Sequence, residues 1–158
     1  MIRVGLGYDI HRVSADRPLV LGGIEIPATF GLDGHSDADV ALHAVMDALL
    51  GAACLGDIGK HFPPSDERFR NASSLGLLAH VRALLEEAGY HPINVDVAIV
   101  AEEPRIAPYA LEMRERTARA LGLSSSAVSI KATTNEQVGP EGRREAISAH
   151  AVALIERA

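Results

Sequence analysis

The sequence predicts a single α+β domain, an α/β sandwich in which helices cover one face of a mixed β-sheet. Segments with apolar residues at every second position alternate along the chain with segments in which they recur every third or fourth. The 158 residues contain no repeat, low-complexity tract or linker, so we expect one domain spanning residues 1–158. Hydrophobic residues make up 47% and aromatic residues only 4%, so the core must be built mainly from Ala, Val, Leu and Ile.

The N-terminal part of the chain predicts a strand followed by a hairpin. Residues Arg3 to His11 have strand character, and two glycines within them indicate a close approach to another backbone. Residues 19–21 and 24–26 flank Gly22-Gly23, which is a two-residue hairpin signal.

The next part predicts a loop, a long helix and a second loop. Gly31 to Gly34 is expected to be a loop, and Asp37 to Cys54 a helix with Asp37 at its cap or in its first turn. Cys54 is the only cysteine, which excludes an internal disulfide, and we expect a small buried thiol. Leu55 to Asp66 is too rich in Gly and Pro for regular structure. It fits a mobile substrate-covering loop, but an ordinary surface loop fits equally well.

The second half of the chain predicts further helices and strands. We expect helices at residues 74–88 and 108–121 and strands at residues 94–101 and 128–132. Gly89 and Gly122 mark the ends of the two helices. By pattern alone, residues 144–158 fit a helix slightly better than a strand.

One face of the predicted sheet has no helix to cover it. Small side chains such as Ala146, Ala149 and Ala151 would suit packing of that face against other subunits. The sequence therefore predicts sheets that pack together in an oligomer.

Charge and hydropathy exclude several classes of function. The formal net charge of −6 argues against nucleic acid, which normally binds a basic face. No apolar run is long enough to cross a bilayer, and the N-terminus lacks a signal peptide pattern, so we expect no membrane association and a cytoplasmic location. A phosphorylated substrate would need local cations, metals or helix N-termini to reverse the overall field.

Two histidines and an aspartate are candidates for a metal site. Asp9 and His11 lie two apart on the first strand and therefore share a side, while His43 lies on the apolar surface of the long helix. Two imidazoles and a carboxylate suit zinc and leave a fourth position open for water or substrate, as in a catalytic site. A core histidine satisfied by one acceptor is the competing interpretation for His43.

Four stretches of the chain resemble the 2-C-methyl-D-erythritol 2,4-cyclodiphosphate synthases, a family of trimeric enzymes of the non-mevalonate isoprenoid pathway. They are GYDIH from Gly7, HSDADVALHAVMDALLGAACLGDIGKHFP from His35, VDVAIVAEEPRI from Val95 and KATTNEQVGPEGR ending at Arg143. The family ends in a strand, so the resemblance replaces the helical interpretation of residues 144–158.

The resemblance implies a reaction and a set of metal ligands. The substrate would be 4-diphosphocytidyl-2-C-methyl-D-erythritol 2-phosphate, whose 2-phosphate attacks the β-phosphate to give the 2,4-cyclodiphosphate and CMP. By position, Asp9, His11 and His43 match the zinc ligands. Glu136 matches the ligand of a second ion, Mg²⁺ or Mn²⁺, between the α- and β-phosphates.

Further residues match the family's catalytic and substrate-binding positions. His35 and Thr134 match groups that stabilise the transition state, with Ser36 beside His35 at the helix N-terminus. The remaining matches are Asp57, Ile58 and Gly59 for the erythritol hydroxyls; Phe62, Pro63, Pro64, Ser65 and Asp66 for the covering loop; and Ala101, Glu102, Glu103, Pro104, Arg105, Ile106, Ala107, Ala132 and Thr133, with Asn135 beside them, for a cytidine pocket that crosses a subunit boundary. Asp9, His11 and Glu136 would contact the substrate as well.

Arg143 matches a residue of a central cavity that accepts an isoprenoid diphosphate in some members, although Pro140 replaces an aromatic residue there.

Two other functions remain compatible with the same residues. A trimeric metal-dependent module could bind nucleotide or isoprenoid diphosphates without turnover, but Glu136 and the DIGKHFP segment argue against it because a binder need not grip both sides of a phosphoanhydride. A metal-dependent phosphohydrolase is the other alternative, and it lacks an evident general base.

Overall fold

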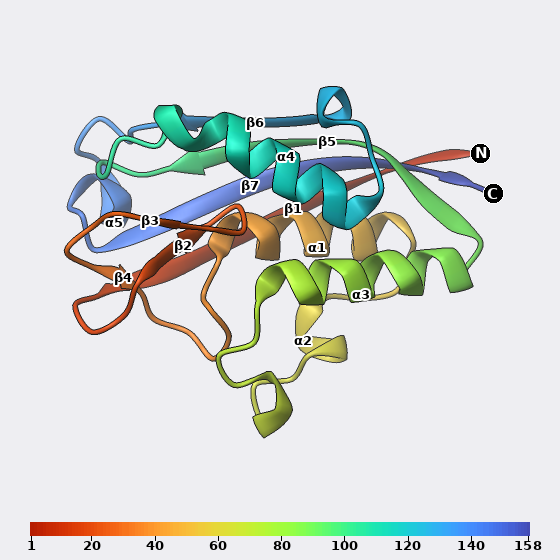
Figure 1. The fold of residues 1–158 in the computed structure, drawn as a ribbon, viewed down its shortest axis with the longest axis horizontal. Helices are drawn as coiled ribbons and strands as arrows, with labels where there is room; N and C mark the ends of the chain where they lie inside the picture. The colour runs from red at the N-terminus through yellow and green to blue at the C-terminus, as the bar shows by residue number, and fades with distance from the viewer.

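The chain folds around a five-stranded sheet with the strand order β4-β1-β7-β5-β6 (Figure 1). The computed structural model describes residues 1–158. The strands are β1 (Ile2–Ser14), β2 (Leu19–Leu21), β3 (Ile24–Ile26), β4 (Gly31–Leu32), β5 (Tyr90–Val100), β6 (Val128–Thr133) and β7 (Ala146–Arg157). The helices are α1 (Val40–Ala52), α2 (Ile58–His61), α3 (Ser74–Glu87), α4 (Ala110–Leu121) and α5 (Gly139–Gly142), with single 3-10 turns at Glu67–Phe69, Ala107–Tyr109 and Ser125–Ala127.

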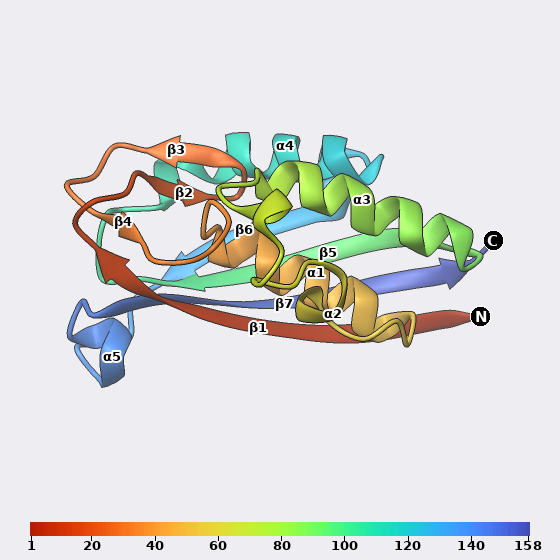
Figure 2. The same ribbon diagram turned by 90° about the horizontal axis from the view of Figure 1, so that it is seen from below.

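The sheet is mixed, as the sequence predicts. Strands β5 and β6 are parallel, and the β1–β7, β5–β7 and β1–β4 pairs are antiparallel. Helices α1, α3 and α4 all lie on one side of the long strands (Figure 2). This confirms the predicted α+β class. The C-terminal segment is strand β7, so the helical pattern in residues 144–158 was misleading and the family resemblance gave the correct element.

Helix α1 packs directly on β1 because β1 carries glycine where the two backbones meet. A Cβ atom at Gly5 or Gly7 would stand 1.8 Å from the carbonyl oxygen of Ala48 or Ala44, respectively. The predicted close approach is thus a strand-to-helix contact. It brings the helix-facing side of β1 against α1. Together with its contacts to β7, α3 and β5, this packing buries eleven of the thirteen residues of α1.

The N-terminal cap of α1 is Asp39 and not Asp37. The Asp39 carboxylate accepts the Leu42 amide at 3.1 Å and also the amides of Gly22 and Gly23 at 3.0 and 2.7 Å, so it ties the β2–β3 hairpin to the helix. Burial, followed by the nearby charge of Asp37, raises the pKa of Asp39 to about 6.

Three other local expectations were wrong. Residues Gly31 and Leu32 form strand β4, because they pair with the end of β1. The segment Leu55 to Asp66 contains the helical turn α2, capped by the side chain of Asp57. Cys54 is exposed, since it follows the end of α1 with a left-handed backbone (φ 60°) that turns its side chain outward.

The uncovered face of the sheet is apolar along β1, but its residues are not the alanines that the sequence suggested. Ala149 and Ala151 are fully buried, because they lie on the side of β7 that faces α1, and Ala146 is buried as well. Large apolar side chains cover the opposite face instead: Ile2, Val4, Leu6, Tyr8 and Ile10 from β1 and Val152 from β7, with exposed fractions between 38% and 71%.

None of the helices combines the length and the apolar character that a membrane crossing requires.

Candidate metal centre and substrate cavity

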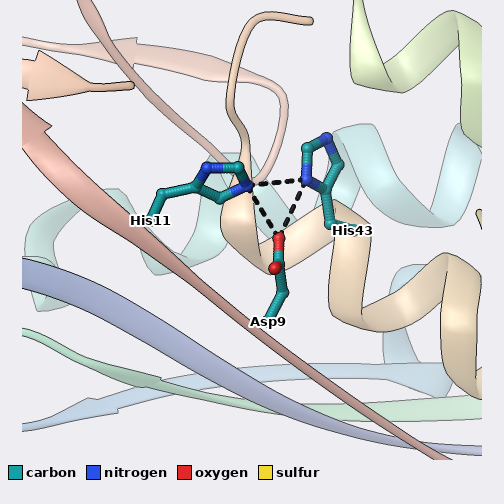
Figure 3. A group of neighbouring side chains, drawn as sticks. All are labelled: Asp9, His11 and His43. Carbon is teal, nitrogen blue, oxygen red and sulfur yellow. Dashed lines mark hydrogen bonds and ion pairs between the residues drawn. The ribbon is translucent and has the colours of Figure 1, made fainter. Parts of the chain in front are cut away.

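Three side chains converge between β1 and α1 (Figure 3). Asp9 and His11 project from the helix-facing side of β1, and His43 projects from α1. The Asp9 Oδ2 atom lies 2.9 Å from His11 Nε2 and 2.9 Å from His43 Nδ1, and the two imidazole nitrogens are 3.1 Å apart. The three residues therefore lie close enough to bind one metal ion.

The outer nitrogens of both imidazoles have partners of their own. His11 Nδ1 lies 2.6 Å from the carbonyl oxygen of Asp33, which can only accept, so this nitrogen carries the proton. His43 Nε2 lies 3.0 Å from Ser36 Oγ and 3.1 Å from Ser74 Oγ. When the outer nitrogens hold the protons, the three inner atoms are all acceptors and present their lone pairs to one point, which is the arrangement a cation requires.

The electrostatics of the cluster also favour a cation. Burial favours the neutral form of Asp9, but hydrogen bonds and charges from His11 and His43 outweigh it and hold the pKa of Asp9 below its usual range. Burial opposes protonation of His11, and the hydrogen bond and charge of Asp9 outweigh it and raise the pKa of His11. The carboxylate is thus an anion that draws positive charge to its partners.

The spacing of the three atoms fits a small tetrahedral ion. Ligand atoms of a tetrahedral zinc ion are about 3.3 Å apart. The measured separations of 2.9 to 3.1 Å would need to open by only a few tenths of an ångström. Three protein ligands leave one coordination position for water or substrate.

The cluster forms one wall of a cavity of about 240 Å³. The cavity is lined by Asp9, His11, His35, Ser36, His43, Met46, Ile58, Gly59, Phe62, Pro64, Phe69 and Leu77. It brings together nine of the residues that the sequence marked as site residues. Met46, Phe69 and Leu77 were not marked, because the first and the last fit the apolar pattern of a helix and no motif includes the second.

The segment after α1 closes one side of this cavity. The Asp57 carboxylate caps α2 by accepting the Lys60 amide at 2.9 Å, and the Ile58 amide donates to Asp47 Oδ1 at 2.8 Å. The Phe62 ring packs edge-on against Phe69, with ring centroids 5.3 Å apart.

The loop that follows α2 is hydrogen-bonded to His35. His35 Nε2 lies 3.1 Å from the carbonyl oxygen of Asp66. Pro63, Ser65 and Asp66 do not line the cavity, although Pro64 between them does.

The residues marked for cytidine lie elsewhere on the chain, where β5 and β6 end. The Ala101 amide donates to the carbonyl oxygen of Thr133 at 3.0 Å, which holds the two strand ends together. Ala132, Thr133, Thr134 and Glu136 are exposed, as are Glu103, Arg105 and Ala107. Pro104 is half-buried and Ile106 is buried.

Glu102 has a role that the sequence did not suggest. Its Oε1 atom accepts the backbone amides of Asn135 and Gln137, each at 3.1 Å. Glu136 between them has a left-handed backbone (φ 51°), as does Gln137 (φ 62°). Glu102 therefore holds the loop that carries Glu136 in an unusual backbone conformation.

Within one chain, the Glu136 loop and the metal cluster are far apart. Along one row of the sheet, Thr133 pairs with Val100, Val100 with Ser148 and Ser148 with Ile10. Three strand spacings of about 4.8 Å separate β6 from β1 by about 14 Å.

Arg143 lies apart from the cavity as well. It follows α5, is exposed and pairs with Glu145 at 2.9 Å.

Comparisons with known proteins show the family to which the chain belongs. The model of the YgbB family matches residues 2–156. A 2-C-methyl-D-erythritol 2,4-cyclodiphosphate synthase from Symbiobacterium thermophilum is 62% identical over 152 residues, covering 96% of this chain and 97% of the relative. The bifunctional IspDF from Campylobacter jejuni superposes with a TM-score of 0.96 at 37% identity, covering 100% of this chain and 43% of that one. IspF from Plasmodium falciparum, solved as a CDP complex, superposes with a TM-score of 0.85 at 32% identity over 99% of this chain and 96% of its own. The chain therefore belongs to the YgbB family, together with these cyclodiphosphate synthases.

Proposed function

We propose that the chain converts 4-diphosphocytidyl-2-C-methyl-D-erythritol 2-phosphate into 2-C-methyl-D-erythritol 2,4-cyclodiphosphate and CMP, acting as a phosphorus–oxygen lyase. The observation that carries the proposal is the Asp9–His11–His43 cluster in the wall of a cavity, in a chain that belongs to a family with many relatives named for this reaction.

The reaction requires the protein to align the reacting groups more than to transfer protons. An oxygen of the 2-phosphate attacks the β-phosphorus, the bond from that phosphorus to the bridging oxygen breaks, and the electron pair leaves with CMP. A phosphate monoester is already largely dianionic at neutral pH, so the nucleophile needs no base. Positioning and charge neutralisation dominate such phosphoryl transfers.

Two metal ions would complete the charge balance. The donor set of Asp9, His11 and His43 suits zinc, and the carboxylate of Glu136 suits Mg²⁺ or Mn²⁺. Bound there, the ions would neutralise and orient the α- and β-phosphates. Glu136 is available for this, because its exposed carboxylate makes no hydrogen bond or ion pair within the chain.

The chain's own side chains would orient the substrate around these ions. Ser36 lines the cavity next to the cluster and can donate a hydrogen bond to a phosphate oxygen. His35 lines it as well, and its Nε2 proton, which points to the Asp66 carbonyl, would have to turn to the phosphate. Ile58, Gly59 and Phe62 line the other side, where the erythritol would lie away from water. Thr134 stands beside Glu136 and would act with it.

A complete site requires a second subunit. A diphosphate cannot span the distance of about 14 Å between β1 and β6, so the cluster of one chain and the Glu136 loop of the same chain cannot hold neighbouring phosphates. A ring of three chains would place the cytidine residues and Glu136 of one subunit beside the cluster of the next, through a heterologous interface that closes on itself.

The apolar face of the sheet supports such a ring. Ile2, Val4 and Leu6 are 64%, 65% and 71% exposed, and they stand in a row on β1 with no helix over them. An exposed apolar row of this kind normally marks an interface between proteins. We therefore propose a homotrimer in which these faces pack together.

The test is to incubate the protein with the cytidylated substrate and follow the products by ³¹P NMR. We expect cyclic diphosphate and CMP in equal amounts. An open-chain phosphate would show a hydrolase, and unchanged substrate with tight binding would show a binding module, and either result would overturn the proposal.

The His43→Ala variant should lose turnover while the assembly remains intact, and His91→Ala is the matched control. His91 is an exposed histidine on β5 that pairs with Glu156 and does not line the cavity. Full activity in His43→Ala would remove this residue from the metal site.

A further inference from the structure

His43 is flanked on its outer side by two hydroxyl groups from different parts of the chain. Ser74 Oγ, in the first turn of α3, lies 3.1 Å from His43 Nε2, and Ser36 Oγ lies 3.0 Å from the same atom. Ser74 is fully buried, while Ser36 and His43 are buried to more than nine-tenths. His43 Nδ1 faces the cluster and lies 2.9 Å from Asp9 Oδ2, so the neutral imidazole can offer a lone pair to a metal ion there only when Nε2 carries the proton.

The proton of Ser74 is already committed to a third residue. Ser74 Oγ donates to Asp37 Oδ1 at 2.5 Å, and the Ser74 amide donates to Asp37 Oδ2 at 2.8 Å. A carboxylate only accepts, and a hydroxyl has a single proton to give. Ser74 can therefore meet His43 Nε2 only as an acceptor, and the proton between them must belong to the imidazole.

We propose that Asp37 and Ser74 are positioning residues that fix the tautomer of His43. The carboxylate of Asp37 orients the Ser74 hydroxyl, the hydroxyl accepts the Nε2 proton, and Nδ1 keeps its lone pair for a metal ion held together with Asp9 and His11. Asp37 contacts neither His43 nor the cavity. Its influence reaches the metal through two hydrogen bonds in series.

The same proton order has a consequence for Ser36. Ser36 Oγ accepts the Ala38 amide at 3.3 Å and shares the Nε2 proton of His43, so its own proton stays free. Ser36 lines the cavity. The free proton is then available to a phosphate oxygen, so the residues that prepare His43 for a cation also leave Ser36 as a donor for an anion.

The Asp37→Asn substitution should reverse the donor–acceptor order of the two hydrogen bonds that link residue 37 through Ser74 to His43. To keep the 2.8 Å bond from the Ser74 amide, the carbonyl oxygen of the new side-chain amide must occupy the Oδ2 position, which turns its NH₂ group toward Ser74 Oγ. The hydroxyl would then donate to His43 Nε2, and the imidazole proton would move to Nδ1, where it blocks the metal. Ser74→Ala only removes one of two acceptors, because Ser36 remains.

The inference rests on the proposed function in one respect, namely that His43 binds the metal ion. The experiment measures the dissociation constant of Zn²⁺ by chelator competition and records the imidazole ¹⁵N shifts of histidine-labelled protein, with the His43 signals identified by their loss in His43→Ala. We expect Asp37→Asn to weaken Zn²⁺ binding roughly 10- to 100-fold, and Ser74→Ala by less. In metal-free protein, Nε2 of His43 should carry a proton in wild type and lose it in Asp37→Asn, whereas Nδ1, 2.9 Å from Asp9 Oδ2, can be protonated in both.

Ser73→Ala is the matched control, because Ser73 is the exposed neighbour of Ser74 at the start of α3 and its side chain makes no capping bond. It should change neither the affinity nor the shifts. Wild-type Zn²⁺ affinity in Asp37→Asn, or an Nε2 of His43 that stays protonated in that variant, would overturn the proposal. A wild-type protein that turns over substrate without binding Zn²⁺ would instead overturn the proposed metal site, so the two failures are distinguishable.

Discussion

The two halves of the proposed active site are prepared to very different degrees. At the cluster of Asp9, His11 and His43, the side chains already converge, and the outer nitrogens of both histidines have hydrogen-bond partners. At the loop of residues 134–137, the backbone is held but the side chains of Thr134 and Glu136 point into solvent. The three side chains of one subunit are therefore close enough to bind a metal ion by themselves, whereas in the proposed trimer the loop would complete the site only against a neighbouring subunit.

The topology explains this difference. Strand β1 lies under α1, so side chains on the helix-facing side of β1 are enclosed by the fold itself. Strand β6 is the last strand of the sheet, so the loop that follows it lies at the edge of the sheet. No other segment of this chain covers the side chains of Thr134 and Glu136, so another molecule would have to enclose them.

Mixed trimers give the strongest test of the comparison. His43→Ala and Glu136→Gln should each reduce turnover roughly a thousandfold, about 4 kcal/mol of transition-state stabilisation, because each removes a metal ligand. Refolding the two variants together in equal amounts should restore about a quarter of wild-type activity, because in a random ring one interface in four has both residues intact. The check is a CMP-release assay on the mixture.

Two results would decide against a shared site. A mixture as inactive as its parents, with exchange of subunits demonstrated by mass spectrometry, would place Glu136 and His43 of the same chain in one site. Activity above a half would mean that one of the two variants alone is not inactive.

The Leu6→Glu variant tests whether the Glu136 loop needs the trimer while the metal cluster does not. A carboxylate in the apolar row of β1 should break the trimer and reduce turnover by several hundredfold, roughly 3 to 4 kcal/mol, because the Glu136 loop loses its partner. Zn²⁺ affinity should remain near that of wild type, because the cluster lies on the other side of β1. Light scattering measures the assembly, and chelator competition measures the Zn²⁺ affinity.

Leu111→Glu, at a 60% exposed leucine on α4, is the matched control and should alter neither the assembly nor the Zn²⁺ affinity. A variant that loses Zn²⁺ and the trimer together would contradict the independence of the cluster.

The two regions also carry negative charge differently, since Asp39 is fully buried at the start of α1 and Glu136 is exposed. The pKa of Asp39 is about 6 in the folded chain and near 3.8 in the unfolded chain, so the folded state binds the additional proton between these values. The contribution of Asp39 to the free energy of unfolding is thus greatest below pH 4 and is lost as pH rises through 6.

Asp39→Asn has no such titration. From pH 4 to pH 7, the free energy of unfolding of wild type should fall relative to this variant by up to about 3 kcal/mol. Urea unfolding at one fixed protein concentration measures the difference. A difference that moves in favour of wild type as pH rises would show that the three amide hydrogen bonds outweigh the burial of the charge.

Much of the fold could be predicted from periodicity and glycine alone. The Gly22-Gly23 hairpin, the glycines of β1 and the end of α3 before Gly89 all follow from local chemistry, and all are present. The spacing of Asp9 and His11 on one side of a strand also predicted two of the three members of the cluster correctly.

The rest depended on tertiary contacts that no local pattern contains. Asp37 and Asp39 are equally good capping residues, and the position of the β2–β3 hairpin decided between them. Alternating small residues in β7 do not reveal which side meets α1, so Ala149 and Ala151 were assigned to the wrong face. Ser74 lies 31 residues from His43, and only the folded chain brings them together.

Substitution of Glu102 tests how the conformation of the loop of residues 134–137 affects turnover. In Glu102→Ala, the amides of Asn135 and Gln137 lose their acceptor, and two consecutive left-handed residues, Glu136 and Gln137, lose the contact that holds them. We expect kcat to fall roughly tenfold, equal to about 1.4 kcal/mol, and hydrogen exchange at the two amides to accelerate.

Glu102→Gln is the matched control, because one oxygen, Oε1, accepts both amides and a glutamine carbonyl can take its place. This variant should keep the slow exchange and most of the activity. If Gln proved as damaging as Ala while exchange stayed slow in both, the charge of Glu102 would act on the substrate directly, as the family resemblance implied. The two variants therefore distinguish two roles for Glu102. If Glu102 shapes the loop, its removal must accelerate exchange at the two amides, whereas exchange can stay slow if Glu102 only contacts the nucleotide.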